Sequence, residues 1–486
     1  MESESLKNLR NLVRLRPIFQ MLLQISRETG IEIYLVGGMV RDALLGRESR
    51  DVDLALSGKT LETALRFAQK TGGTYVLLKE EKETARVVLP GWTVDFAGFR
   101  GPDLKSDLGG RDFTINAIAL PFAPAFEERE WTPFDPLGGM EDLGKRILRM
   151  CGPRSFLEDP LRMLRAFRFM SQLGLTIDPE TRQAVKHGAA LLAGTAPERI
   201  HYELKVMFSQ AECVRAFRVM DEEGLAEVLF PDLALLKAID QKGYHHLDVF
   251  HHSVLTLQSL EDLLRGRIEI PEALRKEVEA YAAFNGNLPA LKWAALFHDL
   301  GKIDAVIETA EKTTFYGHEE YSLKRFEVLA ARFRLSHQEK DLIGRLIRMH
   351  MRPHFWVNEK RKGSLSRRAI LRFIREAGEE LSAVFLLSLA DSLAAQGGEK
   401  PKDTEELLQT LWLEAIALRD EVVRPLEKNS PLITGRDLIA LGLKPGPEFQ
   451  KILESVQESY MDGEISNRDE ALALIKGKFL NKKAKV

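Results

Sequence analysis

The segment that most constrains the fold is YLVGGMVRDALLGRESRDVDLAL, residues 34–56, because it places two carboxylates two positions apart in an apolar run. An apolar stretch ends in Gly37-Gly38, a helix-like stretch follows, and Asp51 and Asp53 lie in the second apolar run. Side chains at positions i and i+2 of a strand point to the same face. The segment therefore predicts a strand, a glycine turn, a helix and a second strand that presents both carboxylates together.

This arrangement of carboxylates, glycines and a helix start suits the binding of a metal ion and of phosphate. Two carboxylates held this close repel each other unless a cation lies between them, and Mg²⁺ is bound by one or two carboxylates together with water and substrate phosphates. Glycines let the backbone approach a ligand, and the helix start offers free N–H groups to a phosphate. Each feature alone is common in a chain with 72 acidic residues, so only their combination indicates a nucleoside triphosphate site with its metal ions.

Composition excludes several classes of protein. The 486 residues are 44% hydrophobic and 29% charged, which is typical of globular proteins with several cores. Only Cys151 and Cys213 are present, so no disulfide framework is expected. No signal-peptide pattern and no membrane-spanning run is found, and we expect a cytoplasmic protein without membrane contact. With a net charge of −3, a polyanion would have to be bound by local basic patches.

The pattern of hydrophobic residues changes along the chain. Runs rich in β-branched and aromatic residues, which predict strands, are concentrated before about residue 150: IEIYLVGG, RDVDLAL, GTYVLLK, ARVVLPGWTVDFAGF and FTINAIAL. From about residue 156 onward the apolar spacing is that of helices. Polar, glycine-containing joints lie near 236–244 and 396–402. These observations predict a mixed α/β domain followed by a predominantly helical remainder.

Four further charged segments follow the first one in a fixed order: DLGGRDFTINAIAL (107–120), FDPLGGMEDLGKRILRM (134–150), FLEDPLRMLRAFRF (156–169) and APERIHYEL (196–204). In this order the five segments resemble the class II tRNA nucleotidyltransferase and bacterial poly(A) polymerase family, strongly over residues 31–205 and more weakly to the C-terminus, where PLITGRDLIALGLKPGP (431–447) is similar to the family's tail. The resemblance implies an α/β nucleotidyltransferase head of the polymerase-beta-like fold.

The resemblance also implies roles for individual residues. Asp51 and Asp53 would bind two Mg²⁺ ions, with Asp95 as a third carboxylate, and Asp112 would accept a hydrogen bond from the ribose. The implied nucleotide-binding residues are Gly37, Gly38, Arg41, Arg111, Asp112, Asn116, Glu158, Asp159, Arg162, Arg165 and Arg168. One position departs from the family, which usually has an arginine where this chain has Gly110.

The segment Glu158-Asp159-x-x-Arg162 resembles the family's base-reading element. A carboxylate accepts a hydrogen bond from an exocyclic amine, and an arginine donates to the neighbouring ring acceptor. Cytosine and adenine offer this pattern on one edge, whereas uracil and guanine present the opposite one. An Asp–Arg pair can therefore select CTP and ATP without a nucleic-acid template. The alternative is a helix start with a plain i,i+4 surface ion pair.

A second chemistry is indicated in the helical half, where histidines and aspartates recur in HHLDVFHHSVLTL (245–257), LFHDLGK (296–302), YGHEEYS (316–322), RMHMRPH (348–354) and SLADSLA (388–394). These segments resemble the HD phosphohydrolase domain. The resemblance implies metal ligands at His252, His298, Asp299, His318, His350 and Asp391. Such ligands suit Mn²⁺, Ni²⁺ or Mg²⁺, with a bound water as nucleophile. The alternative is a domain that keeps its shape but has no activity.

Basic residues in NEKRKGSLSRRAILRF (358–373) could follow an RNA backbone: Arg361, Lys362, Arg367 and Arg368. A second basic cluster ends the chain at 476–486. The alternative for each cluster is an ordinary solvated face.

Taken together, the sequence predicts an enzyme that adds CMP and/or AMP from CTP and ATP to the 3′ end of tRNA, with a second hydrolase site and no implied protein partner. The predicted parts are a helical N-terminus (1–30), the head (31–150), an all-α neck and body (151–240), the HD domain (241–400) and a helical, RNA-binding tail (401–486). The alternatives are a poly(A) polymerase, an HD phosphohydrolase with a regulatory nucleotide-binding head, and an RNA-binding scaffold with an inactive head.

Overall fold

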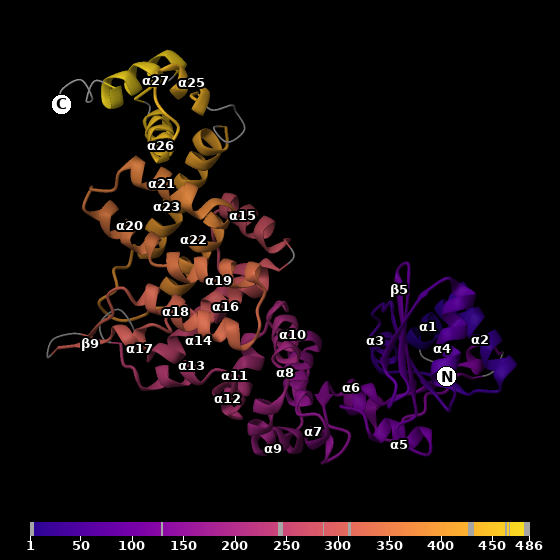
Figure 1. Cartoon of the computed structure of the whole chain (residues 1–486). Coiled ribbons are helices and arrows are strands. Elements are labelled where there is room, and N and C mark those ends of the chain that lie inside the picture. The colour runs from indigo at the N-terminus through magenta and orange to yellow at the C-terminus, as the bar shows by residue number, and fades with distance from the viewer. Residues whose placement is uncertain are drawn as a thin grey trace. The chain divides into compact units, whose positions relative to one another are not determined.

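The computed structural model describes residues 4–127, 130–241, 246–284, 286–309, 313–425, 432–461, 464–465 and 467–480 (Figure 1). The chain forms two compact units, which divide between Leu229 and Phe230. The first contains the predicted α/β head and the helices that follow it. The second is almost entirely helical. The predicted α/β head followed by an all-α remainder is thus confirmed.

A six-stranded sheet forms the centre of the head, with the strand order β3-β4-β5-β2-β1-β6. The pair β2 and β5 is parallel, and the other neighbours are antiparallel. The strands span Ile33–Val36 (β1), Asp51–Leu56 (β2), Thr74–Lys79 (β3), Thr84–Leu89 (β4), Trp92–Gly98 (β5) and Leu120–Pro121 (β6). Four of the five early runs of β-branched and aromatic residues therefore supply β1 to β5, as predicted.

The two faces of this sheet differ in chemistry because side chains alternate along each strand. On β2, Val52, Leu54 and Leu56 belong to the main core of the head, whereas Asp51 and Asp53 point to the opposite face. The main core is covered by three helices, which lie beside the sheet in indigo in Figure 1. They are α1 (Glu4–Leu15), α2 (Pro17–Thr29) and α4 (Thr60–Thr71).

The run FTINAIAL differs from the strand that its composition predicts. Residues Thr114–Asn116 form a short 3-10 helix (η1), and only Leu120–Pro121 pair as a strand. Residues 113–120 are buried without interruption. A continuous apolar run of this length does not distinguish a buried strand from another buried segment.

The helix α8 (Leu161–Leu173) packs against α10 (Pro197–Phe208) and α11 (Val214–Glu222) in the rest of the first unit. Its buried side chains recur at helical spacing, for example Met163, Phe167 and Met170. The remaining elements are α3 (Gly37–Leu44), α5 (Leu104–Gly109), η2 (Ala123–Phe126), α6 (Gly139–Gly144), β7 (Ile147–Leu148), α7 (Ser155–Glu158), β8 (Thr176–Ile177), α9 (Pro179–Gly188), η3 (Ala189–Gly194) and α12 (Leu225–Leu229).

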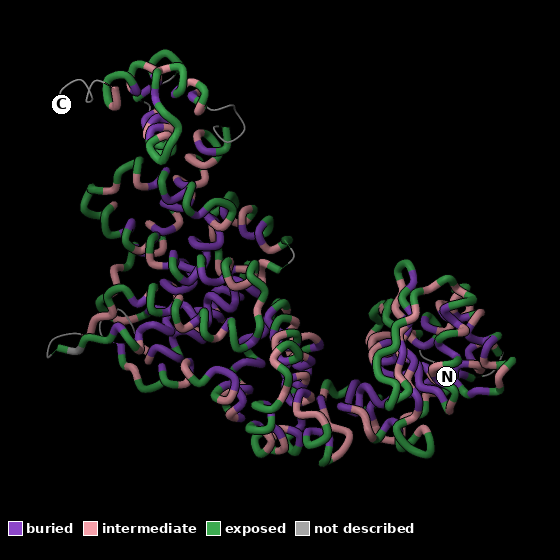
Figure 2. The backbone as a smooth tube through the Cα atoms, in the orientation of Figure 1, coloured by how far each residue is buried: buried purple, intermediate pink, exposed green. Residues whose placement is uncertain are grey.

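The second unit is built around helices that are apolar on nearly all sides. Every described position from Pro289 to Phe297 in α16 (Asn287–Phe297) is buried, and α22 (Leu381–Ala394) is nearly as apolar. Figure 2 shows the resulting purple segments inside this unit. A helix that is hydrophobic all round is expected in the middle of a large helical core. His298 of the predicted metal site directly follows α16, and Asp391 lies in the last turn of α22, so the core fixes the position of that site.

The other elements of the second unit surround these helices. They are α13 (Pro231–Leu235), η4 (Leu236–Ala238), α14 (Val249–Leu264), α15 (Glu272–Ala282), α17 (Lys302–Ala305), β9 (Ile307–Glu308), β10 (Thr313–Thr314), α18 (His318–Arg332), α19 (His337–Met349), α20 (Arg352–Arg361), α21 (Arg367–Ala377), η5 (Gly378–Glu380), α23 (Thr404–Leu418), the π-helix η6 (Arg419–Val423), α25 (Gly435–Ala440), α26 (Pro447–Met461), α27 (Arg468–Ile475) and the π-helix η7 (Lys476–Leu480). Among the described residues, no helix combines the length and the apolar character needed to cross a membrane.

Candidate functional site

One polar cavity of about 730 Å³ in the first unit brings together most of the predicted head residues. We call it the head cavity, and its lining includes seven arginines and six aspartates. Among the predicted residues, the lining contains Gly37, Gly38, Arg41, Asp51, Asp53, Asp95, Arg111, Asp112, Asn116, Asp159, Arg162, Arg165 and Arg168. Glu158 is not among the lining residues, and its side chain is 48% exposed.

The carboxylates of the sheet lie on the cavity side because of the strand register. Asp53 on β2 is the register partner of Asp95 on the parallel strand β5. Asp95 is in turn the register partner of Arg86 on β4, whose guanidinium binds it through two hydrogen bonds of 2.7 and 2.8 Å. The three acidic side chains Asp51, Asp53 and Asp95 therefore share one face, and Arg86 neutralises one of them.

The glycine turn is in direct contact with Asp53. The Gly38 N–H donates a hydrogen bond of 2.9 Å to Asp53 Oδ2. Gly37 has a φ of +68°, and a Cβ atom at this position would lie 2.7 Å from the same oxygen. Both the backbone conformation and the close approach thus require glycine. Desolvation raises the pKa of the half-buried Asp53 despite the Gly38 hydrogen bond, so this carboxylate favours a nearby cation.

A chain of charged and polar contacts links the head to α8 and α10. Arg41 Nη1 donates to Asn116 Oδ1 at 2.7 Å, and Asn116 Nδ2 donates to Asp112 Oδ1 at 3.0 Å. Arg165 binds Asp112 Oδ2 through Nε at 3.0 Å and Nη2 at 2.7 Å. Burial alone would raise the pKa of Asp112, but the Arg165 charge and the hydrogen bonds hold it well below its usual range. Asp112 is therefore ionised and already accepts several donors.

The buried Glu203 on α10 continues this network. Its carboxylate lies 2.5 Å from Arg168 Nε and 3.7 Å from Arg165 Nη1. Three guanidinium groups lie over the ring of Phe169, at 4.1 Å for Arg168, 5.1 Å for Arg41 and 5.6 Å for Arg165. The network holds these arginines at the cavity wall with defined orientations, which favours binding of an anion.

A second group of arginines lies at the Gly110 position. Arg100 Nη1 and Arg162 Nη2 each donate to the Gly110 carbonyl at 2.8 Å. Partial desolvation lowers the pKa of the half-exposed Arg100, and the nearby charges of Arg111 and Arg162 act in the same direction. The mutual repulsion of these cations is relieved when a polyanion binds among them. The chain thus has arginines at this wall although it lacks one at position 110.

The predicted base-reading residues lie at the start of α8. Arg199 Nη2 on α10 donates to Asp159 Oδ2 at 2.8 Å, and Asp159 Oδ1 accepts a bond of 3.3 Å from the Leu161 N–H. Arg162 Nη1 is 3.8 Å from Glu158, which is the predicted i,i+4 pair in a loose form. Because Arg162 also donates to backbone carbonyls, its guanidinium is held at the cavity rather than on the outer surface.

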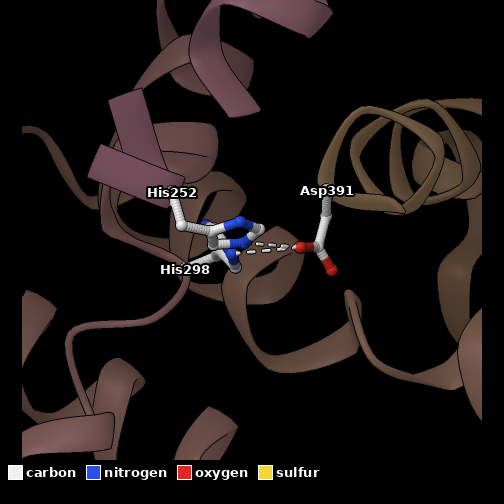
Figure 3. Close-up of side chains that lie close together, drawn as sticks. All are labelled: His252, His298 and Asp391. Carbon is white, nitrogen blue, oxygen red and sulfur yellow. Dashed lines mark hydrogen bonds and ion pairs between the residues drawn. The ribbon is translucent and has the colours of Figure 1, made fainter. Parts of the chain in front are cut away.

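The predicted metal ligands of the second unit also come together. His252 on α14, His298 after α16 and Asp391 on α22 converge in Figure 3, where ring nitrogens of both histidines face one carboxylate oxygen. His252 Nε2 is 2.8 Å from Asp391 Oδ1, and His298 Nε2 is 3.7 Å from the same atom. His298, Asp299 and His350 form an adjoining group. His318 Nε2 lies 3.1 Å from Asp299 Oδ1.

The orientation of three of these histidines is fixed by the backbone. The Nδ1 atoms of His298, His318 and His350 lie 2.9, 2.9 and 2.6 Å from carbonyl oxygens three residues earlier. A carbonyl only accepts, so each Nδ1 carries a hydrogen, and each Nε2 is the atom available at the centre of the cluster. This is the usual second contact of a metal-binding histidine. The donor set of imidazoles and carboxylates fits a divalent transition metal or Mg²⁺.

The charges in the cluster are strongly coupled. Burial alone would lower the pKa of His298, but the Asp299 carboxylate raises it to about 10. Burial, followed by the charges of His298 and His318, lowers the pKa of His350 far below its usual value. Lys302 Nζ also lies 2.7 Å from Asp299 Oδ2. The buried carboxylates thus attract positive charge, which a proton or a metal cation can supply.

A separate cavity of about 370 Å³ opens beside this cluster. Its lining includes Asp299, His354 and Asp391 together with aromatic residues such as Phe315 and Phe355. Arg361, which the sequence predicts as an RNA contact, lines this cavity and binds Asp403 at 2.6 Å. The other three predicted RNA-binding residues, Lys362, Arg367 and Arg368, are exposed at the end of α20 and the start of α21.

Four family models match parts of the chain, and the last two matches overlap. They are the poly A polymerase head domain (33–149), the probable RNA and SrmB-binding site of polymerase A (174–236), the HD domain (249–396) and the tRNA nucleotidyltransferase domain 2 (333–475). An A-adding tRNA nucleotidyltransferase of Deinococcus radiodurans is 33% identical over 91% of this chain and 94% of its own length.

The chain belongs to the tRNA nucleotidyltransferase family. A CC-adding tRNA nucleotidyltransferase of Thermus thermophilus is 29% identical over 91% of this chain and 93% of its own length. Among solved structures, a CCA-adding enzyme with CTP has a TM-score of 0.65 at 21% identity, with 97% of both chains covered. The Thermotoga maritima CCA-adding enzyme complexed with tRNA has a TM-score of 0.63 at 22% identity, with 97% of this chain and 98% of the other covered.

Some residues of these nucleotidyltransferase and HD sites are not found by reading the sequence. Arg86 and Arg100 line the head cavity but are not among the predicted site residues, although Arg86 lies in a run that predicts a strand. Lys302 and His354 lie inside quoted motifs, but only the structure shows that they contact Asp299 and Asp391, at 2.7 and 2.9 Å. The spacing of Lys302, three residues after Asp299 in HDLGK, is the signal that could have identified it.

We expect Gly37→Ala to reduce nucleotidyl transfer by at least about a hundredfold, because the new Cβ atom displaces the Asp53 carboxylate. Gly46→Ala is the matched control, since Gly46 has a similar φ of +70° but no atom within 4 Å of an added Cβ. Both variants should lose about 1 kcal/mol in the free energy of unfolding because of the positive φ. Single-turnover rates and denaturant unfolding test this, and equal activities of the two variants would contradict it.

Proposed function

We propose that this enzyme adds CMP and/or AMP to the 3′ end of tRNA without a nucleic-acid template, by phosphoryl transfer assisted by two Mg²⁺ ions. The observation that carries the proposal is the head cavity itself. It joins the carboxylate face of Asp51, Asp53 and Asp95 to the pair Asp159 and Arg162. Metal-assisted chemistry and base selection can therefore act on one bound nucleotide. The names of the relatives, which include A-adding and CC-adding enzymes, support the same substrates.

The carboxylates suit a hard cation, because all the ligand atoms they offer are oxygens. Bound Mg²⁺ would activate the RNA 3′-hydroxyl and neutralise the leaving pyrophosphate. Among the chain's own groups, the Gly38 N–H orients Asp53 and Arg86 orients Asp95. In the reaction the 3′-oxygen bonds to the α-phosphorus, its proton is released, and the bond to the pyrophosphate oxygen breaks.

The arginines would bind and orient the triphosphate. Arg41 from α3 and the cluster of Arg100 and Arg111 line the same cavity, and their planar forks match phosphate oxygens. Asp112 would contact the ribose. Its two oxygens already accept from the Phe113 N–H, Asn116 and Arg165, so a ribose hydroxyl would have to replace one of these donors. Selection of the ribose would then be coupled to a small movement of Arg165.

Base selection would depend on Asp159 and Arg162. The carboxylate would accept from the exocyclic amine of cytosine or adenine, and the guanidinium would donate to the adjacent ring nitrogen. The match to a poly A polymerase head leaves poly(A) synthesis as the second candidate in this family. The same base-reading pair would serve both reactions.

We expect Asp51→Asn or Asp53→Asn to abolish nucleotide addition while tRNA binding remains. Loss of a metal ligand that stabilises both nucleophile and leaving group should raise the barrier by at least about 4 kcal/mol, or about a thousandfold in rate. Single-turnover incorporation and filter binding measure the two properties. Asp341→Asn, on an exposed position of α19, serves as the control. Near-normal incorporation by both cavity variants would refute the metal assignment.

We expect Asp159→Ala or Arg162→Ala to relax nucleotide choice more than it weakens triphosphate binding. Incorporation of UMP or GMP should rise relative to CMP and AMP, because the edge contacts that distinguish the bases are lost. Competition assays with all four nucleotides measure this preference. Arg154→Ala, at an exposed arginine before α7, is the control. If the variants slow all four nucleotides equally, the start of α8 has only a structural role.

The buried cluster in the second unit supports a second activity on the same chain. We propose that it binds Mn²⁺, Ni²⁺ or Mg²⁺ through His252, His298, Asp299, Asp391 and the neighbouring histidines His318 and His350. The site would hydrolyse small phosphoesters such as 2′,3′-cyclic nucleotides or nucleotide monoesters. A cyclic phosphate at an RNA end lacks the free 3′-hydroxyl that nucleotide addition needs, so such a hydrolase could restore it. An HD phosphohydrolase regulated by the head is the alternative from another class.

We expect His298→Ala combined with Asp299→Ala to remove phosphoesterase activity and leave nucleotide addition nearly unchanged, because each unit contains its own metal ligands. Hydrolysis is measured across Mg²⁺, Mn²⁺, Ni²⁺ and Co²⁺. The control is His337→Ala with Asp341→Ala, an exposed pair on α19. The hydrolase proposal is wrong if the purified protein shows no phosphoesterase activity that the cluster variant lacks.

A further inference from the structure

The head cavity is dominated by charged side chains, and its described lining contains two aromatic rings, Phe169 and Tyr202. Phe169 is buried and lies under the guanidinium groups of three arginines. The ring of Phe169 is therefore already covered by the protein. Tyr202, by contrast, is 62% exposed. Among the described residues that line the cavity, Tyr202 thus offers the aromatic surface that a ligand can reach.

The position of Tyr202 on α10 places it beside the base-reading residues. Arg199, one helical turn earlier on the same face, holds Asp159 through an ion pair of 2.8 Å. The next residue, Glu203, holds Arg168 at 2.5 Å. Val206, one turn later, also lines the cavity. On this face of α10, Arg199 thus contacts the base-reading segment and Glu203 contacts α8, and Tyr202 lies next to both residues in the helix and lines the same cavity.

The presence of an aromatic ring at Tyr202 is not explained by a need to anchor α10. The residues that anchor this helix are buried on its other side, for example Ile200, Leu204 and Met207. A large aromatic side chain that is mostly exposed contributes little to such a core. Exposure of a ring within a polar cavity is instead typical of a surface that stacks with a flat ligand.

We propose that Tyr202 stacks against the base of the incoming nucleotide while Asp159 and Arg162 read its edge. This inference rests on the proposed function, because it assumes that the head cavity binds a nucleotide. Every base has a π-face, so stacking on an aromatic ring tolerates different bases. In this proposal Tyr202 supplies affinity for both cytosine and adenine, and the Asp159–Arg162 pair selects these two bases against uracil and guanine.

The positions of the sheet carboxylates and of Asp159 favour the incoming nucleotide over the RNA end as the partner that stacks on Tyr202. The RNA 3′-hydroxyl must be placed near the sheet carboxylates Asp51 and Asp53, which belong to the head. Tyr202 instead belongs to the helix that contacts Asp159. When the edge of a base faces Asp159 and Arg162, the flat face of the same base is therefore free to stack on the Tyr202 ring.

The test compares Tyr202→Ala with Tyr202→Phe, which keeps the ring and loses the hydroxyl. Equilibrium binding of ATP and CTP to the full-length protein with Mg²⁺ is measured by calorimetry, together with single-turnover incorporation and tRNA binding. We expect Tyr202→Ala to weaken ATP binding about tenfold, and CTP binding less because the pyrimidine ring is smaller. Tyr202→Phe should stay within about twofold of the parent protein, and tRNA affinity and the preference over UTP should not change.

Tyr321→Ala, which removes an exposed tyrosine from α18 in the second unit, is the control for nonspecific effects. Unchanged nucleotide binding by Tyr202→Ala would overturn the proposal, as would a loss that falls on tRNA affinity alone. A Phe variant as weak as the Ala variant would also overturn it, since the hydroxyl and not the ring would then be used. If the parent protein binds ATP but adds no nucleotide, the proposed function fails, whereas the stacking role is still decided by the binding data.

Discussion

The contact between the glycine turn and Asp53 is the constraint on which the head site depends. A hydrogen bond of 2.9 Å from the Gly38 N–H fixes the carboxylate, and Gly37 leaves no room for any side chain beside it. The same turn ends β1 and begins α3, so it also places Arg41 at the cavity. One local feature thereby sets the position of the carboxylate that we propose as a metal ligand and of the arginine that we propose as a phosphate contact.

The parts around this contact are held together by paired charges that are largely shielded from solvent. Asp112, in the head, is bound by Arg165 of α8, and Glu203 of α10 holds Arg168. Breaking such a pair costs more than an exposed ion pair would, because an unpaired buried charge remains. The arginines of this cavity wall are therefore held in defined orientations before any ligand arrives. Preorganised charge of this kind is the main means by which phosphoryl transfer is accelerated.

Sequence reading succeeds where local geometry determines the outcome. Asp51 and Asp53 share a face because side chains alternate along a strand. The histidine and aspartate segments of the second unit lie on several helices, and their convergence was predicted by the resemblance to the HD domain and not by local geometry. Sequence reading fails where partners come from other elements and no resemblance points to them. The pairing of Arg86 with Asp95 depends on the register of β4 with β5, and the pairing of Arg199 with Asp159 depends on the packing of α10 on α8. No spacing within a single segment carries that information.

The central claim is that the head cavity adds C or A to tRNA and reads the base with protein side chains. The most direct measurement incubates the purified protein with tRNA that lacks the 3′ CCA, or lacks only the final A, and supplies each nucleoside triphosphate separately with Mg²⁺. The account predicts addition of a small, fixed number of C and/or A residues and no addition of U or G. Incorporation of none of the four nucleotides, or equal incorporation of all four, would contradict it.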